Sequence, residues 1–396
     1  MSIDLPAGDE PARVAFYNDP KVRSIAYQVA LCIVVGLLVY GAAINAIDNL
    51  EKAHIASGFG FWTHTAGFDI SQTLISYSNL STYGRAFWVG LLNTLLVAGF
   101  GIFFATIIGF IVGIARLSKN WLVNKAASGY VETIRNIPLL LQLLFWYNAV
   151  LKALPSLRES VVIPGGAYLN NRGLFLPKPL TASGFGYVEL AVVLGIAVSI
   201  AFQIWARKRQ EKSGQQAPVF LVSLLLIVGL PLVVLALAGV PLSFSYPHAG
   251  RFNIDGGLEV LPEFAALLFG LSLYTAAFIA EVVRAGITSV SRGQTEASYS
   301  LGMRPGPTLR LIVIPQAMRV IIPPLTSQYL NLLKNSSLAV AIGYPDLVQV
   351  FTGTVLNQTG QAVEVVAITM AVYLSISLVT SLLMNFYNSR IALVER

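Results

Sequence analysis

The sequence contains one cysteine, three histidines and few charged residues among its 396 positions. Only 11% of the residues are charged, whereas soluble proteins carry about a quarter. So few charges cannot cover the surface of a water-soluble protein of this length. Cys32 lies in an apolar run without a disulfide partner, and His54, His64 and His248 are scattered without the spacing of metal ligands. These absences exclude a soluble globule and argue against a metal site.

Sequence motifs for catalysis are missing as well. The chain has no phosphate-binding GxxxxGK[ST] loop, and indeed no Gly-Lys dipeptide, and it has neither a GxSxG nor an HExxH motif. A membrane-embedded enzyme would need a nucleophile or a metal cluster, and neither is visible. We therefore expect no ATP hydrolysis and no bound cofactor in this chain.

What the sequence does have is apolar runs, and 55% of its residues are hydrophobic. Crossing a bilayer takes about 20 such residues. The first run is too long for a signal peptide and predicts a retained helix. The third run is the least certain, because polar residues interrupt it. We predict an all-α polytopic membrane protein with about eight spans, near residues 24–44, 84–115, 128–154, 187–205, 219–240, 263–283, 312–335 and 364–388.

Basic residues predict the orientation, because they gather in cytoplasmic loops. With the N-terminus inside, 18 of the 26 Lys and Arg residues fall on the cytoplasmic side and seven outside, with Lys334 within a span. This asymmetry predicts that both termini and the segment 284–311 are cytoplasmic. The net charge of +7 then reports these loops and lipid headgroups rather than nucleic acid.

Three long segments should lie outside, at residues 45–83, 155–186 and 241–262. They are rich in Gly, Pro, Ser and aromatic residues. They could dock an extracytoplasmic partner or merely connect the spans. Residues 336–363 could hold a re-entrant or additional short helix.

The spans contain amides and hydroxyls, which suggests a polar pathway for a solute. Lys334 could pair with an anionic substrate or extend to the membrane surface, and the amides could serve helix–helix hydrogen bonds instead. Pro138 either bends a helix along the pathway or starts one. The candidate pathway residues are Asn93, Thr94, Pro138, Gln142, Lys334, Asn335, Ser336 and Ser337.

Two further patterns concern helix packing and an alternative mechanism. The sequence GFIVG at 109–113 is a GxxxG pattern, which lets another helix approach closely. An ion-coupled secondary transporter would need a carboxylate in its spans, and Glu281 and Glu364, at span edges, are the only weak candidates. That alternative for small polar solutes stays open.

The stretch 293–317, GQTEASYSLGMRPGPTLRLIVIPQA, interrupts the apolar pattern. Ser291 and Gln294 have the spacing of a capping box, and the following residues can form two helical turns. Gly302 is a natural left-handed helix stop, after which Pro305 and Pro307 permit a turn. We predict a short cytoplasmic helix held between two spans, whose face of small residues suits a groove on another protein.

This stretch resembles the EAA loop of ABC importer permeases, which has the pattern EAA, three residues, Gly, nine residues and then Ile-x-Leu-Pro. The spacing is kept, while Ser298 replaces the third small residue and Ile314 replaces the leucine. In that family the loop forms the coupling helix that docks on the ATP-binding subunit. The resemblance therefore implies ATPase coupling by Glu296, Ala297, Ser298, Leu301, Gly302, Ile312 and Pro315.

Two more segments point to the polar amino-acid uptake permeases. Residues 132–147, ETIRNIPLLLQLLFWY, and 332–343, LLKNSSLAVAIG, are similar to segments of that family. The remaining length resembles the long permease subunits of general L-amino acid transport systems. The implied organisation is a leader, first helix and periplasmic loop at 1–83, a permease core at 84–154 and 262–396, and an insertion with two extra helices at 155–261.

The resemblance implies a type I ABC importer permease fold in the bacterial inner membrane. It also implies a second similar permease chain, a dimeric ABC ATPase that carries ATP and Mg, and a periplasmic amino-acid-binding protein. Membrane lipid would surround the spans, and no nucleic acid is expected. The implied activity is uptake of polar L-amino acids by alternating access.

Overall fold

The computed structural model describes residues 20–52, 57–182, 184–250 and 253–391. The leader before Pro20 lies outside these ranges, as do His54, Arg251 and Arg396. Within the described residues, seven helices are long and apolar enough to cross a membrane, or eight when one bent pair counts as a span. The expected helical membrane fold with about eight spans is confirmed.

The first six candidate spans are built from ten elements. They are α1 (Pro20–Lys52), α2 (Tyr83–Ala115), α3 (Trp121–Asn136), α4 with η3 (Leu139–Leu144 and Phe145–Leu151), α5 (Phe185–Ser213), α6, η5 and α7 (Val219–Leu224, Leu225–Gly229 and Leu230–Leu237) and α8 (Pro262–Thr288). After α8 come α9 (Arg292–Ser300), α10 (Pro305–Thr308), η6 (Leu309–Val313), α11 (Ile314–Asn335), η7 (Ser336–Ile342), η8 (Val348–Val355), α12 (Leu356–Thr359) and α13 (Ala362–Ile391).

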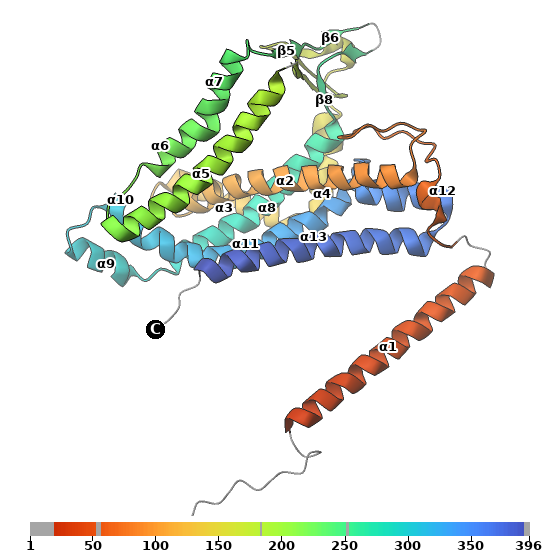
Figure 1. The fold of residues 1–396 in the computed structure, drawn as a ribbon, viewed down its shortest axis with the longest axis horizontal. Helices are drawn as coiled ribbons and strands as arrows, with labels where there is room; N and C mark the ends of the chain where they lie inside the picture. The colour runs from red at the N-terminus through yellow and green to blue at the C-terminus, as the bar shows by residue number, and fades with distance from the viewer. Residues whose placement is uncertain (1–19, 53–56, 183, 251–252, 392–396) are drawn as a thin grey trace, which may run out of the picture.

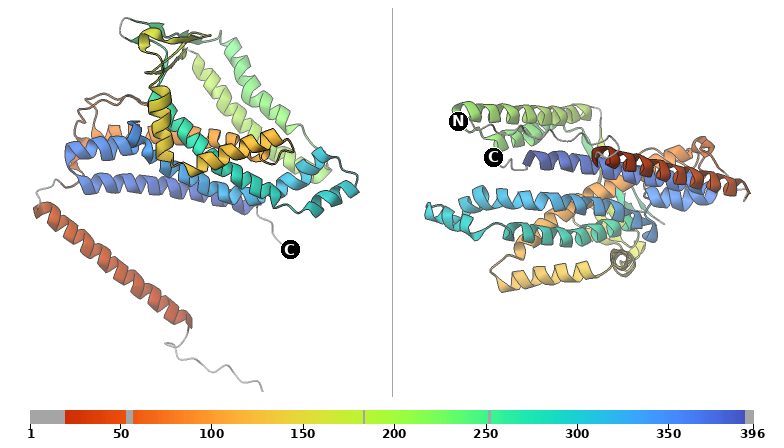
Figure 2. Two further views of the ribbon diagram at one scale, coloured as in Figure 1. Left: turned by 180° about the vertical axis from the view of Figure 1, so that it is seen from behind. Right: turned by 90° about the horizontal axis from the view of Figure 1, so that it is seen from below.

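The third predicted span, 128–154, is wrong as one straight helix. It consists of α3 and the α4–η3 helix, which meet at an angle of 105° (Figure 2, left). The break falls at Pro138, which has no N–H to continue the helix and forces Ile137 into an extended conformation, with φ −99° and ψ 127°. Pro138 lies at the N-terminus of α4, so the chain both bends and starts a new helix at this residue.

Helices α2 and α8 form the centre of the fold. The predicted close approach at 109–113 occurs here, because a Cβ on Gly109 would lie 2.5 Å from Cγ2 of Ile279 and one on Gly113 would lie 2.7 Å from the carbonyl oxygen of Ala280. Only a residue without a side chain fits at either position. The GxxxG pattern therefore serves packing within the chain.

The helix that follows α9 begins earlier than expected. Pro305 and Pro307 were predicted to form a turn, but they lie in the first turn of α10, which continues through η6 into α11. Proline is tolerated there because the first N–H groups of a helix have no partner in it. Helix α11 then packs against α8, where a Cβ on Gly286 would lie 2.3 Å from Cγ1 of Ile321.

The predicted insertion at 155–261 contains short strands as well as helices. A four-stranded antiparallel sheet has the order β1 (Val161–Ile163), β2 (Ala167–Asn170), β3 (Gly173–Leu176) and β8 (Leu258–Val260). Two further pairs join β4 (Lys178–Thr181) to β5 (Leu242–Ser245) and β6 (His248–Ala249) to β7 (Ile254–Asp255). The strands lie at one end of α5, α7 and α8, while α9 and α10 lie at the other (Figure 1).

Residues 57–82 and 336–361 pack together at the outer end of α2. The short helix η2 (Gly60–Thr63) brings Phe61 and Trp62 onto Phe87 of α2 and Phe351 of η8, with ring centroids 5.1–6.5 Å apart. The additional short helices expected within 336–363 are η7, η8 and α12. Apolar aromatic packing thus closes this end of the core.

Two elements stand outside the core. The hairpin of α5 with α6–α7 packs mainly on itself, and a Cβ on Gly195 would lie 2.2 Å from the carbonyl oxygen of Leu226. The apolar stretch of helix α1 is not buried against the rest of the described chain (Figure 1). Both elements therefore present apolar side chains to their surroundings.

The seam between α2 and α8 predicts a large difference between two glycines of one helix. Gly109→Val should lower the free energy of unfolding by about 1–3 kcal/mol, because the new side chain overlaps Ile279. Gly99→Val is the matched control, since a Cβ there meets nothing within 4 Å. Thermal unfolding of the detergent-purified protein measures both, and equal melting temperatures would contradict the seam.

Candidate coupling helix and polar pathway

Helix α9 ends as the sequence predicts. Gly302 has a φ of +75°, its N–H donates to the carbonyl of Tyr299 at 2.9 Å, and the N–H of Met303 donates to the carbonyl of Ser298 at 3.1 Å. This pair of bonds is the Schellman motif, which ends a helix and fixes the direction of the chain after it. The direction of α9 is therefore set by its own backbone.

The start of α9 differs from the prediction. Ser291 is the N-cap residue, but its side chain makes no capping hydrogen bond. The side chain of Gln294 instead accepts a hydrogen bond from Nε2 of Gln316 on α11, at 3.4 Å. The predicted capping box is wrong, because Gln294 is drawn toward a residue 22 positions away.

Three of the seven predicted docking residues belong to an exposed group on α9 and at its C-terminal end. Glu296, Ala297, Tyr299 and Leu301 are exposed, and Leu301 retains 82% of its accessible surface. The side chain of Leu301 thus projects from the end of α9 instead of packing on the rest of the chain. The face combines one carboxylate with small and apolar groups.

Ser298 belongs to the inside of this turn rather than to the exposed face. It is 1% exposed, and its hydroxyl lies 2.7 Å from the carbonyl of Thr295 and 3.0 Å from the hydroxyl of Thr308. Thr308, equally buried, donates to the carbonyl of Arg304 at 3.0 Å. Ser298, one of the two residues that depart from the EAA pattern, thus links α9 to α10.

Ile312 and Pro315 lie beside α9 across a groove of about 730 Å³. The groove separates the α8–α9 junction from the first turns of α11, and Gln294, Gln316 and Arg319 also line it. The structure therefore brings the two ends of the predicted coupling segment together around one depression.

An ion-pair cluster holds α2 to α8 at the same end of the molecule. The carboxylate of Glu281 accepts hydrogen bonds from Arg116 at the end of α2 and from Arg284, whose Nη2 lies 2.5 Å from Oε1. The carbonyl oxygen of Arg116 also accepts a hydrogen bond from the side-chain amide of Asn124 on α3. Glu281 thus acts as a structural anion shared by two arginines.

Glu364, the second carboxylate considered for ion coupling, also has a hydrogen-bond partner. Its Oε1 accepts the N–H of Gly58, which fastens the outer segment to the start of α13. Both carboxylates therefore have structural partners in the part of the chain that is described.

The predicted pathway residues form two groups, which meet at Tyr373, because its hydroxyl bonds with Thr94 of the first group and Ser336 of the second. Asn93 and Thr94 are fully buried, with Nδ2 of Asn93 donating to the carbonyls of Gln72 and Pro345 and Oγ1 of Thr94 accepting the N–H of Leu347. These bonds hold the segments 57–82 and 336–361 against α2.

Gln142 has a comparable role at the helix break. Its Nε2 donates to the carbonyls of Ile134 and Ile137, both at 2.9 Å. These carbonyls lie at the end of α3, where the helix leaves them without partners. The amide of Gln142 therefore caps α3 across the bend that Pro138 creates.

The second group lies at the end of α11 and is more open. Lys334 is exposed, Asn335 and Ser337 are half-buried, and the buried Ser336 donates to the carbonyl of Leu333 at 2.8 Å. This second group of candidates therefore lies at the junction of α11 and η7.

Sequence reasoning missed two features of this region. Ser327, Asn331 and Lys334 are all exposed and follow one face of α11 at spacings of four and three residues, a pattern visible in the sequence. Asp346 is fully buried, where it accepts the N–H of Gln349 and the hydroxyl of Tyr373. Its capping spacing to Gln349 could have revealed it.

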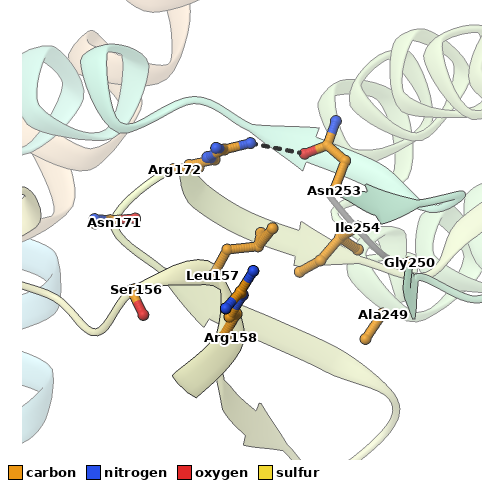
Figure 3. A pocket seen from close by; sticks show the side chains of 9 residues that line it. All are labelled: Ser156, Leu157, Arg158, Asn171, Arg172, Ala249, Gly250, Asn253 and Ile254. Carbon is orange, nitrogen blue, oxygen red and sulfur yellow. Dashed lines mark hydrogen bonds between the residues drawn. The ribbon is translucent and has the colours of Figure 1, made fainter.

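The strand layer contains a separate hollow of about 560 Å³ (Figure 3). Arg158 and Arg172 point into it from two segments, with Asn171 and the β6–β7 pair around them. Arg172 donates to Oδ1 of Asn253 at 3.2 Å. The hollow offers positive charge on the side of the molecule opposite α9.

The Glu281 cluster predicts rescue by exchange of charges. Glu281→Arg alone places three arginines together and should lower the free energy of unfolding by about 2 kcal/mol, between the values for exposed and buried pairs. Adding Arg116→Glu restores an opposite charge and should recover much of the loss.

Thermal unfolding of the four combinations measures this coupling, and Lys125→Glu on the exposed face of α3 is the control. A double variant no more stable than Glu281→Arg would disprove the pairing.

Comparison with known proteins gives these features their context. The sequence pattern of the family described as binding-protein-dependent transport system inner membrane component matches residues 214–393. The chain is 55% identical to the general L-amino acid transport system permease protein AapQ of Rhizobium johnstonii, over 97% of this chain and 96% of the relative. It is 52% identical to the protein named putative amino-acid ABC transporter permease protein YhdX of Escherichia coli, over 96% of this chain and 97% of the relative.

A third relative, the glutamate/glutamine/aspartate/asparagine transport system permease protein BztB of Rhodobacter capsulatus, is 42% identical over 96% of both chains. These likenesses favour an importer permease over an ion-coupled transporter, in agreement with the paired state of Glu281. The chain belongs to the family of amino-acid ABC transporter permeases.

Proposed function

We propose that this permease subunit moves polar L-amino acids into the bacterial cytoplasm and that a separate dimeric ABC ATPase drives it through α9. The observation that carries the proposal is the exposed face of Glu296, Ala297 and Leu301 on a helix whose direction the Schellman turn at Gly302 fixes. ATP and Mg would bind the ATPase, not this chain. The relatives named above transport amino acids, which supports the substrate class.

The proposed orientation places α9 and both termini in the cytoplasm and the strand layer outside the inner membrane. The excess of basic residues on the α9 side supports it. The strand layer would then face a periplasmic amino-acid-binding protein, and the hollow with Arg158 and Arg172 suits acidic groups on that partner.

The path from ATPase to transport runs through packed helices. Closure of the ATPases would displace α9, which is attached to α10 by Ser298 and Thr308 and continues from α8. Because α8 packs tightly on α2 and α11 at glycine positions, the displacement reaches all three helices. Alternating access is then a movement of this body against a second, similar permease chain.

We assign the substrate route to the exposed face of α11. Ser327, Asn331 and Lys334 supply a hydroxyl, an amide and an ammonium group, which match the polar and carboxylate atoms of an amino acid. Pro323 and Pro324 also interrupt the hydrogen bonds of α11 and free backbone carbonyls on this stretch.

The coupling proposal predicts loss of ATP-driven uptake with retained assembly of the spans. Glu296→Lys combined with Gly302→Pro reverses the exposed charge and removes the left-handed turn, so uptake should fall at least about tenfold. Transport of labelled amino acids into proteoliposomes that contain the complete transporter measures it.

Glu189→Lys provides the control, because it makes the same charge reversal at the exposed outer end of α5. If the α9 variant takes up amino acids at the normal ATP-dependent rate, α9 is not the coupling element.

The route on α11 predicts a specific change in the response to substrate. Lys334→Ala should abolish most of the stimulation of ATPase activity by amino acid while leaving basal hydrolysis, whereas Lys334→Arg should retain part of it through its charge. Lys178→Ala, on the exposed strand β4, is the control. Unchanged stimulation in Lys334→Ala would remove this residue from the route.

A further inference from the structure

The end of α5 on the α9 side carries a dense group of cations. Arg207, Lys208, Arg209 and Lys212 are all exposed within two helical turns, with Glu211 as the single carboxylate among them. The group follows directly on the apolar part of the span. It therefore lies where the membrane interior gives way to headgroups and water.

These cations surround a defined hollow rather than a flat surface. Trp205, Lys208, Arg209, Lys212, Ser213 and Gln215 line a depression of about 430 Å³. The guanidinium of Arg209 lies 5.3 Å above the ring of Trp205 and donates to Oε1 of Gln215 at 2.8 Å. The hydroxyl of Ser213 donates a hydrogen bond to the carbonyl of Arg209 at 2.8 Å, and Gly214 ends the helix with a φ of +68°.

The environment of the hairpin identifies the partner class. Helix α5 uses small residues such as Ala191, Gly195 and Ser199 for packing, while Leu190, Val193 and Ile200 point outward. In the most apolar 18-residue stretch of each helix, only 22% of α5 and 6% of α6–α7 is buried. Acyl chains can thus lie along both helices directly below the cationic hollow.

Membrane orientation alone requires positive charge but not this arrangement. Basic residues scattered through a loop would serve the orientation equally well. Here an indole, which favours the headgroup level, supports a guanidinium whose direction is fixed, and two lysines stand beside it. A phosphodiester on a lipid fits the positive charge of the hollow and its place at the end of the apolar span.

We propose that the hollow at Trp205, Lys208, Arg209 and Lys212 is a binding site for an anionic phospholipid headgroup from the leaflet on the α9 side. The lipid phosphate lies against Arg209 and the two lysines, and the acyl chains follow the α5–α7 hairpin. The site is independent of the cargo and of ATPase coupling.

The test uses the complete transporter, purified in neutral detergent and freed of lipid. Phosphatidylglycerol, phosphatidylcholine or inorganic phosphate is added, and bound lipid and melting temperature are measured by native mass spectrometry and thermal unfolding. Phosphatidylglycerol should bind and raise the melting temperature, while phosphatidylcholine and phosphate should do neither. The combined variant Lys208→Gln, Arg209→Gln and Lys212→Gln should weaken phosphatidylglycerol binding at least about tenfold, since each cation contributes about fivefold.

The control is Lys119→Gln with Lys125→Gln, which removes charge from the same side of the membrane near α3 and should leave binding unchanged. If the triple variant does not fold, Arg209→Lys keeps the charge but loses the contacts to Trp205 and Gln215, and should still weaken binding several-fold.

Three results would overturn the proposal. The first is equal phosphatidylglycerol affinity in the variants and in the original protein. The second is a full stabilisation by inorganic phosphate, which would indicate a free-anion site. The third is loss of the ATPase subunit from the lipid-free variant, which would make the cations a protein contact. None of these readouts depends on amino-acid transport, so a failure here leaves the proposed function untouched.

Discussion

The contact between α2 and α8 is the constraint on which the rest of the structure depends. In a membrane, helices are not driven together by the hydrophobic effect, because lipid is as apolar as their side chains. Close van der Waals contact must hold them, and Gly109 and Gly113 permit it by leaving room for Ile279 and the backbone of Ala280. Helix α8 then leads into α9 and, beyond it, into α11, which packs back on α8 at Gly286. A displacement of α9 is therefore expected to move α8 and α11 as well.

Features set by neighbouring residues could be predicted from the sequence. The apolar runs predicted the spans, and Gly302 predicted the end of α9, because a left-handed residue after a helical run has few alternatives. The capping box failed for the opposite reason. Spacing shows that Gln294 can reach Ser291, but it does not show that Gln316 competes for the same side chain. The strand pairing of β3 with β8 likewise joins segments about 80 residues apart.

The polar residues of the spans mark the limit of prediction. An amide that caps a helix and an amide that contacts a substrate are the same chemical group, and only the fold distinguishes them. Asn93 finds its acceptors at Gln72 and Pro345, and Gln142 finds its acceptors at the end of α3, after Pro138 has broken the helix. Lys334, in contrast, meets no comparable set of acceptors and stays exposed. Sequence alone identified the class of residue, and the fold assigned the individual roles.

The α5–α7 hairpin and the exposed face of α11 differ in the surroundings that suit them. The α5–α7 hairpin turns apolar side chains outward and ends in cations, which suits contact with lipid. The face of α11 presents Ser327, Asn331 and Lys334 together with an interrupted backbone at Pro323 and Pro324. Lipid cannot satisfy these groups, since each polar group left unpaired in hydrocarbon costs several kcal/mol. A second chain and a water-filled route between the two can satisfy them. The polar face of α11 therefore suits contact with a second chain, as the proposed substrate route requires.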